Sequence, residues 1–334
     1  MGGVVVRDET ETKWLEDKKS FFGETASNVH LNEPGERAWP QLGFGIINGS
    51  DLYIPYSLHG SILTIFTNGA GSLENGPFND GVFHSADSGT NWQIERVSDT
   101  DASLPTMSKT KGYYYYFAAG FPPKPDAGWE LWFARKSVDG NSWDAPKIIT
   151  MAFCDNALCW KYIAEVQEDT VHLCWLDRRH EKRRFNLGGE AKRQNYEVAY
   201  SRRKDSDANW SNDVILSKGM LYSYSPSMSV EGDKIVVAWA GVQTAADWHA
   251  PYSPNDIYYV TSKDGGKSWT EPLRVTDNIK AGVTAGDPQV VLLNGIIHLT
   301  YIQGKLNLKQ ESPGLTKLNQ PPWPIYYTQR PFPE

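Results

Sequence analysis

The sequence has little cysteine and lacks the patterns that would assign it to several broad classes of protein. It has three cysteines, Cys154, Cys159 and Cys174, and this small, odd number does not suit a disulfide framework. No run of about 18 apolar residues occurs, so we predict no transmembrane helix and no membrane partner. The motifs of zinc proteases, P-loop nucleotide sites and dinucleotide-binding folds are absent, so we expect no cofactor and no metal.

An excess of positive charge is also absent. Lys and Arg number 33 against 40 Asp and Glu, which gives a net charge of −7. A nucleic-acid partner would need a basic face, so this composition argues against one. Residues 1–8 lack the apolar core of a signal peptide, which leaves a cytoplasmic protein or a mature secreted form. The sequence indicates no oligomeric state.

Aromatic residues are plentiful, and one short pattern recurs between alternating apolar segments. The pattern has Ser first, Asp third, Gly fifth and Trp last, at 85–92 and 262–269. A shorter copy occupies 137–143, and a degraded copy without Gly occupies 201–210. Ser and Asp side chains can bind backbone N–H groups across a turn, Gly accepts a positive φ, and Trp fills space beneath the hairpin. We therefore interpret the pattern as a structural staple.

This pattern resembles the Asp-box, or BNR repeat, of sialidase-like β-propellers. The resemblance covers nearly the whole chain and implies an all-β propeller with Asp-box hairpins. The repeat length is roughly 50–65 residues, within the range of propeller blades. Five blades are favoured, because inner strands open at Pro40, Pro105, Tyr162, Pro226 and Pro288. A sixth blade would have to lie within residues 43–84.

The chain is predicted to form one domain, residues 27–334, preceded by an extension at 1–26. The last blade has three predicted strands, and residues 28–32 resemble the fourth strands of the other blades. We expect this N-terminal strand to complete the last blade and to close the ring, which would remove exposed sheet edges.

Function is expected on the face opposite the Asp-boxes, where long loops should surround a pocket. Asp177 ends an apolar strand there, and Arg178, Arg179 and His180 follow it. Asp177 could be a general acid or base, with the arginines and His180 binding an anionic group of the substrate. The alternative is a charged surface loop anchored by an Asp–Arg pair.

Two histidines occupy matching loop positions in different blades. His59 and His249 could each transfer a proton near neutral pH, and Trp248 could stack on a sugar ring. The alternative is a loop held down by its own Trp, with histidines at the surface. Further substrate-binding candidates open the inner strands: Arg37, Trp160, Lys161, Tyr222, Tyr224 and Asp287. Asp287 could instead only cap the turn before Pro288.

The family comparison predicts an enzyme that acts on a carbohydrate or a similar polar or anionic substrate, such as an oligosaccharide. In sialidases an Arg-Ile-Pro motif lies near the N-terminus; the nearest match here, Arg37-Ala38-Trp39-Pro40, is one residue longer. Sialidases bind the substrate carboxylate with three arginines and use an Asp acid/base and a Tyr–Glu nucleophile pair. The other two arginines and the Tyr–Glu pair have no assigned match in this sequence. A glycoside hydrolase and a polysaccharide-lyase-like enzyme are therefore both open. The alternatives are a non-catalytic ligand-binding or interaction propeller and a metabolic enzyme for a small non-sugar molecule.

Overall fold

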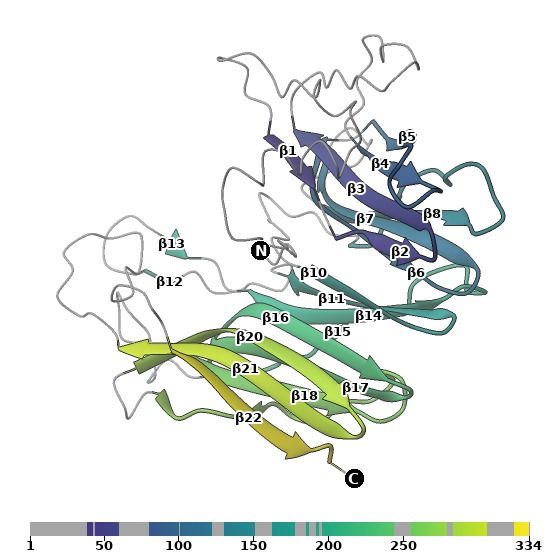
Figure 1. The fold of residues 1–334 in the computed structure, drawn as a ribbon. Helices are drawn as coiled ribbons and strands as arrows, with labels where there is room; N and C mark the ends of the chain where they lie inside the picture. Colours follow the sequence, from purple (N-terminus) through teal and green to yellow (C-terminus); the bar gives the residue numbers. More distant parts are fainter. Residues whose placement is uncertain are drawn as a thin grey trace, which may run out of the picture. The chain divides into compact units, whose positions relative to one another are not determined.

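The computed structural model describes an all-β protein (Figure 1). The described residues are 39–42, 44–59, 80–99, 101–121, 130–150, 162–177, 185–186, 192–193, 196–243, 255–278, 283–305 and 324–333. They contain essentially no helix, and none that is long and apolar enough to cross a membrane. The chain divides into two compact units, Met1–Leu158 and Cys159–Glu334.

The first unit contains two antiparallel sheets. Its first sheet is formed by β1 (Trp39–Leu42), β2 (Ile46–Asn48), β3 (Asp51–His59), β4 (Asp80–Ser85) and β5 (Gln93–Ser98). Both β1 and β2 pair with β3, at successive positions, so together they fill one inner-strand position. The second sheet has the order β6 (Asp101–Lys109), β7 (Tyr113–Phe121), β8 (Glu130–Ser137) and β9 (Lys147–Ile148).

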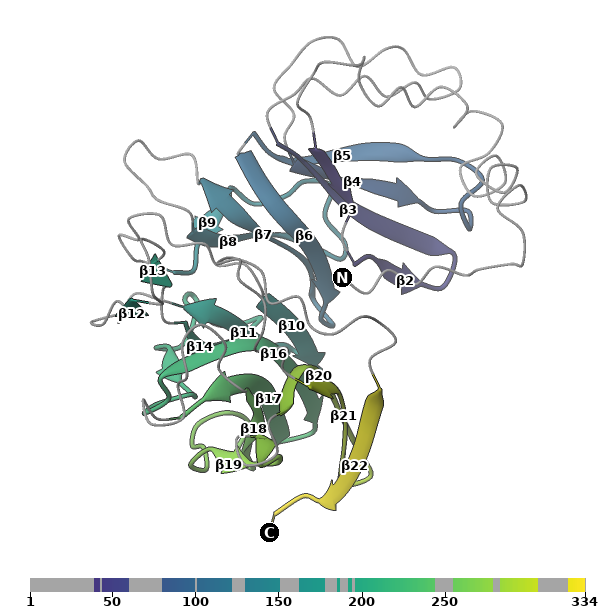
Figure 2. The ribbon, with the colours of Figure 1, turned by 90° about the vertical axis from the view of Figure 1, so that its left-hand side faces the viewer.

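The second unit contains three larger sheets (Figure 2). One sheet has the order β10 (Tyr162–Gln167), β11 (Thr170–Asp177), β14 (Glu197–Lys204) and β15 (Val214–Ile215). The next has β16 (Tyr222–Glu231), β17 (Lys234–Val242), β18 (Asp256–Ser262) and β19 (Leu273–Arg274). The last has β20 (Val283–Leu293), β21 (Ile296–Lys305) and β22 (Ile325–Pro331). A separate pair, β12 (Phe185–Asn186) and β13 (Lys192–Arg193), was not predicted.

The predicted all-β class and repeated four-stranded unit are confirmed. Five sheets of the predicted kind follow one another along the described parts of the chain. The last sheet has three strands there. Its expected fourth strand, residues 28–32, and most of the segment suggested for a sixth blade, residues 60–79, lie outside the described residues. Ring closure by the N-terminus therefore stays a prediction, as does the single domain at 27–334.

The Asp-boxes have the hydrogen bonds expected of hairpin staples. Between β18 and β19, Ser262 Oγ accepts a bond from the Gly266 N–H at 2.9 Å. Asp264 Oδ1 accepts bonds from the N–H groups of Lys267 and Ser268. The bonds that Asp264 receives, above all from the Ser268 hydroxyl, lower the pKa of its carboxyl group. These bonds keep the carboxylate ionised and fix the turn.

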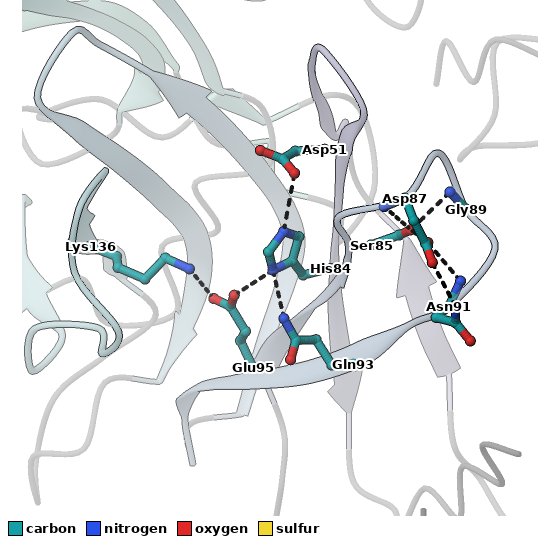
Figure 3. A network of polar contacts seen from close by, with 9 residues as sticks. All are labelled: Asp51, His84, Ser85, Asp87, Gly89, Asn91, Gln93, Glu95 and Lys136. Atoms are coloured by element: carbon teal, nitrogen blue, oxygen red, sulfur yellow. Dashed lines mark hydrogen bonds and ion pairs between the residues drawn. The ribbon is translucent and has the colours of Figure 1, made fainter. Parts of the chain in front are cut away.

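Tryptophans of the Asp-boxes connect neighbouring sheets. The Trp269 ring meets Tyr200 of β14 edge-on, with centroids 4.8 Å apart. In the first unit, the Trp143 indole donates a hydrogen bond to Glu95 Oε2 of β5 at 3.0 Å. Lys136 contributes a second bond to the same oxygen at 2.5 Å, within a polar network that also includes His84 (Figure 3). Trp143 and Trp269 therefore pack between sheets, as the sequence predicted for box tryptophans.

Candidate functional site

At the ends of the strands away from the Asp-boxes, an acidic side chain repeatedly accepts a hydrogen bond from a hydroxyl. Glu130 opens β8 and accepts a bond from the Thr150 hydroxyl at 2.5 Å, while Thr150 Oγ1 accepts the Leu131 N–H at 2.9 Å. In the same way, Asp256 opens β18 and accepts a bond from the Thr276 hydroxyl at 2.7 Å. Each acid lies 20 residues before its hydroxyl partner.

Sequence reasoning missed these acid–hydroxyl pairs. A related arrangement follows Glu197, which opens β14: Ser217, 20 residues later, accepts the Val198 N–H at 2.8 Å, as Thr150 accepts that of Leu131. The recurrence of an acid and a later Ser or Thr was the available signal. Because Glu130 and Asp256 each bond a hydroxyl that follows the fourth strand of the same sheet, we interpret these two buried acids as structural.

Side chains of β16 bind the backbone of β20 and so join the inner strands of two neighbouring sheets. Ser227 Oγ accepts the Val290 N–H at 3.1 Å, and Ser229 Oγ accepts the Leu292 N–H at 2.9 Å. At the end of the row, Glu231 accepts bonds from the N–H groups of Asn294 and Gly295. We call this row of contacts the β16–β20 ladder. It fixes how the two strands lie relative to each other.

Beyond the ladder, both strands are interrupted by a bulge at an X-Pro corner. The pairing register shifts between Tyr224 and Ser227 in β16, and between Gly286 and Gln289 in β20. Ser225 has a φ of 56° and Asp287 a φ of 45°. A left-handed conformation is uncommon for such residues, and a following proline restricts the backbone further. Strained residues and bulges occur often at functional sites, where they aim side chains.

The two corners meet through their side chains. The Ser225 hydroxyl donates a hydrogen bond to Asp287 Oδ1 at 2.5 Å. Ser225 is buried, whereas Asp287 is exposed. A carboxylate that could bind a ligand is therefore held by a buried donor from the neighbouring sheet.

Tyrosines lie beside this pair. The rings of Tyr222 and Tyr224 stack with centroids 6.1 Å apart, and Tyr196 meets Tyr222 edge-on at 6.4 Å. The Tyr224 hydroxyl approaches Gly286 so closely that a Cβ there would lie 2.9 Å from it. Burial, and then the charge of Asp287, raises the pKa of Tyr224. Its hydroxyl therefore stays protonated at neutral pH and can donate a hydrogen bond.

The structure brings three of the predicted site residues together and places a fourth elsewhere. Tyr222, Tyr224 and Asp287 form the group just described. Asp177 ends β11, directly opposite Glu197 of β14. It is 1% exposed, and its Oδ2 accepts the indole N–H of Trp175 at 2.8 Å. Asp177 is therefore a buried carboxylate that bonds within its own strand, and its role stays a prediction.

The other predicted site residues are not placed. His59 ends β3, but its side chain lies outside the described residues. The remaining candidates lie entirely outside them: Arg37, Trp160, Lys161, Arg178, Arg179, His180, Trp248 and His249. Their roles stay predictions. Where the structure describes the chain, no three His, Cys, Asp or Glu side chains gather as metal ligands.

The described group combines an acceptor, a donor and aromatic faces. Asp287 offers carboxylate oxygens, and Tyr224 offers a neutral hydroxyl. The tyrosine rings offer apolar surface beside these polar groups. Sugars present hydroxyls and C–H faces, so this combination suits carbohydrate binding.

Comparison with known proteins supports the fold. No protein-family model and no curated protein matches the sequence. The α-L-arabinanase from Penicillium chrysogenum, solved with arabinobiose, has a similar structure with a TM-score of 0.50 and 14% identity, over 85% of this chain and 81% of that one. An α-L-arabinofuranosidase from Fusarium graminearum, solved with an iminosugar inhibitor, has a TM-score of 0.48 and 15% identity, over 79% of this chain and 77% of that one. A Trypanosoma rangeli sialidase has a TM-score of 0.41 and 12% identity, over 65% of this chain and 37% of that one.

At these identities the likeness concerns the fold alone. The repeated four-stranded sheets, their Asp-box hairpins and the similarity to the Penicillium structure agree with one another. The chain therefore has a β-propeller fold.

Proposed function

We propose that this protein is a glycoside hydrolase whose sugar substrate binds where β16 and β20 begin. Tyr222 and Tyr224 would contact the sugar, and Asp287 would bind or activate it. The observation that carries this proposal is the exposed carboxylate of Asp287, held at a strained corner beside two stacked tyrosines. The similar Penicillium enzyme, solved with arabinobiose, supports a sugar as the ligand class.

Hydrolysis fits the described groups better than elimination does. Glycosidases use carboxyl groups on either side of the scissile bond, and Asp287 would supply one of them. Elimination from a uronic acid would need an unprotonated His or Tyr base. Because the pKa of Tyr224 is raised, its hydroxyl is a poor base at neutral pH. The predicted anion-binding residues Arg178 and Arg179 would bind the carboxylate of an acidic sugar.

The test is a substrate panel with matched variants. Purified protein is incubated with arabinan, arabino-oligosaccharides, xylan, sialyl glycosides and uronic-acid glycosides, and released sugar is measured. Asp287→Asn suits the site because Asn tolerates a positive φ. We expect it to lower kcat/KM about 100-fold or more on the parent's best substrate while melting stays near the parent value.

The control is Glu271→Gln, which removes an exposed carboxylate from the hairpin between β18 and β19. This variant should keep full activity. Full activity of Asp287→Asn would contradict the proposed site. A parent protein that binds a sugar but hydrolyses none of the panel would instead be a sugar-binding propeller, for which the stacked tyrosines would suffice.

A further inference from the structure

We propose that Ser225 is a positioning residue, whose hydroxyl holds the Asp287 carboxylate in one rotamer and leaves Oδ2 to the substrate. This inference rests on the proposed function, because the substrate is the sugar that Asp287 is proposed to bind. Ser225 would act through Asp287 and would not touch the sugar.

The hydrogen bond itself is the first support. An ionised carboxylate can only accept, so the Ser225 hydroxyl must donate its proton to Oδ1. Bonds of this kind are short and stronger than those between neutral groups, in agreement with the distance of 2.5 Å. Among the described residues, Ser225 is the one hydrogen-bond donor to Asp287. Oδ1 is thereby occupied, whereas no residue in the described parts of the chain bonds Oδ2.

The backbone on both sides is the second support. Both corners have a left-handed φ, and both precede a proline that limits their freedom. The β16–β20 ladder continues directly from the corners, with Ser227 and Ser229 bound to the backbone of β20. The distance between Ser225 and Asp287 is therefore fixed by two strands that cannot slide past each other. Such support for a contact residue is what a precise site requires.

A purely structural role for Ser225 makes a different prediction. If the hydroxyl only joined the two sheets, as Ser229 does, its loss would lower stability and leave kinetics unchanged. Ser229→Ala is therefore the matched control, since it removes a hydroxyl of the same strand that also bonds β20. It should lower the melting temperature with unchanged kcat and KM.

The experiment compares Ser225→Gly and Ser225→Ala with the parent. Both variants lack the hydroxyl, but Gly adopts a φ of 56° freely and Ala does not, so their stabilities should differ. Positioning predicts the same kinetic loss in both, about tenfold in kcat/KM and mostly in kcat, measured on arabino-oligosaccharides or the best substrate of the panel. Crystal structures of both variants should show Asp287 in more than one rotamer.

The proposal is overturned if Asp287 keeps a single rotamer in Ser225→Gly, or if Ser225→Gly retains parental kcat and KM. Kinetic losses that follow the different stabilities of the Gly and Ala variants would also overturn it. If the parent hydrolyses no sugar at all, the proposed function fails. The rotamer comparison then still decides whether Ser225 positions the carboxylate.

Discussion

The hydroxyl of Tyr200 occupies the space that a side chain at Gly266 would need. Tyr200 lies on β14, and Gly266 lies in the Asp-box hairpin that follows β18. The same Tyr200 ring packs against Trp269 and binds His172 Nδ1 through its hydroxyl at 2.7 Å. One tyrosine therefore connects an Asp-box to the preceding sheet, and its neighbours are sensitive positions.

We predict that Gly266→Ala destabilises the protein by about 3 kcal/mol. The left-handed conformation costs an L-residue about 1–2 kcal/mol, and overlap with Tyr200 adds a similar amount. Gly219→Ala is the control, because Gly219 has nearly the same φ and nothing within 4 Å of the added Cβ. Urea denaturation measures both variants. Equal losses in the two would show that Tyr200 imposes no constraint.

Stability should fall in mild acid because of His172. Burial, followed by the charge of Arg202, lowers the pKa of His172 to about 4. An unfolded histidine titrates near 6.5, so between pH 6.5 and pH 4 the unfolded chain binds a proton that the folded protein does not. This difference removes about 3 kcal/mol of the unfolding free energy as the pH falls, and none above pH 6.5.

Urea denaturation from pH 4 to pH 8 tests this prediction. His172→Gln should flatten the acid side of the profile relative to the parent. An unchanged slope in His172→Gln would assign the acid sensitivity to other groups.

Lys136 should contribute strongly to the stability of the first unit. Its ammonium binds Glu95 and lies about 5.5 Å from the ring centroids of Tyr53, Tyr114 and Trp143. Lys136→Met would leave the largely buried Glu95 without this cation, at a cost of about 3 kcal/mol. Adding Glu95→Gln should recover part of the loss, and a double-mutant cycle measures the coupling. Strictly additive losses would contradict a coupled pair.

Asp177 tests the distinction between anchor and catalyst. Asp177→Asn weakens the acceptor for the Trp175 indole in a buried position, so we expect a loss of about 1–2 kcal/mol in stability. Activity of the folded fraction should be retained. A normally stable Asp177→Asn protein with a rate loss of about 100-fold would instead support the acid or base role that the sequence suggested.

Ring closure predicts that the N-terminus is needed for stability. If residues 28–32 complete the last sheet, deletion of residues 1–32 exposes a strand edge beside β22. The truncated protein should be insoluble or melt far below the parent, as differential scanning calorimetry would show. Deletion of residues 1–26 alone is the control and should have little effect. A soluble 1–32 deletion with a parental melting temperature would exclude this closure.

The fold was predictable where a local pattern encodes it. The hairpin was predicted from Ser262, Asp264 and Gly266, because each has a fixed role in bonding or shaping the turn backbone. The hydrogen bonds in the structure are those expected. The inner strands expected to open at proline were found as well, but β16 and β20 begin at Tyr222 and Val283, ahead of Pro226 and Pro288. Neither the short β12–β13 pair nor the sharing of one position by β1 and β2 has such a pattern.

The candidate site was predictable only in part. Tyr222, Tyr224 and Asp287 were chosen because inner strands open toward one face. Their closeness depends on a contact between Ser225 and Asp287 across 62 residues, which no local pattern encodes. The left-handed conformations of both residues were also invisible, since Ser-Pro and Asp-Pro ordinarily indicate an extended or turn geometry.

The β16–β20 ladder constrains the sequence of one of its two strands more than that of the other. Ser227, Ser229 and Glu231 contribute side chains, whereas β20 and the turn after it contribute only main-chain amides. Every residue except proline carries such an amide. The sequence of β20 can therefore drift without losing this junction, while β16 must keep its alternating acceptors. Repeats joined in this manner can diverge until their common ancestry is hidden and still assemble in the same order.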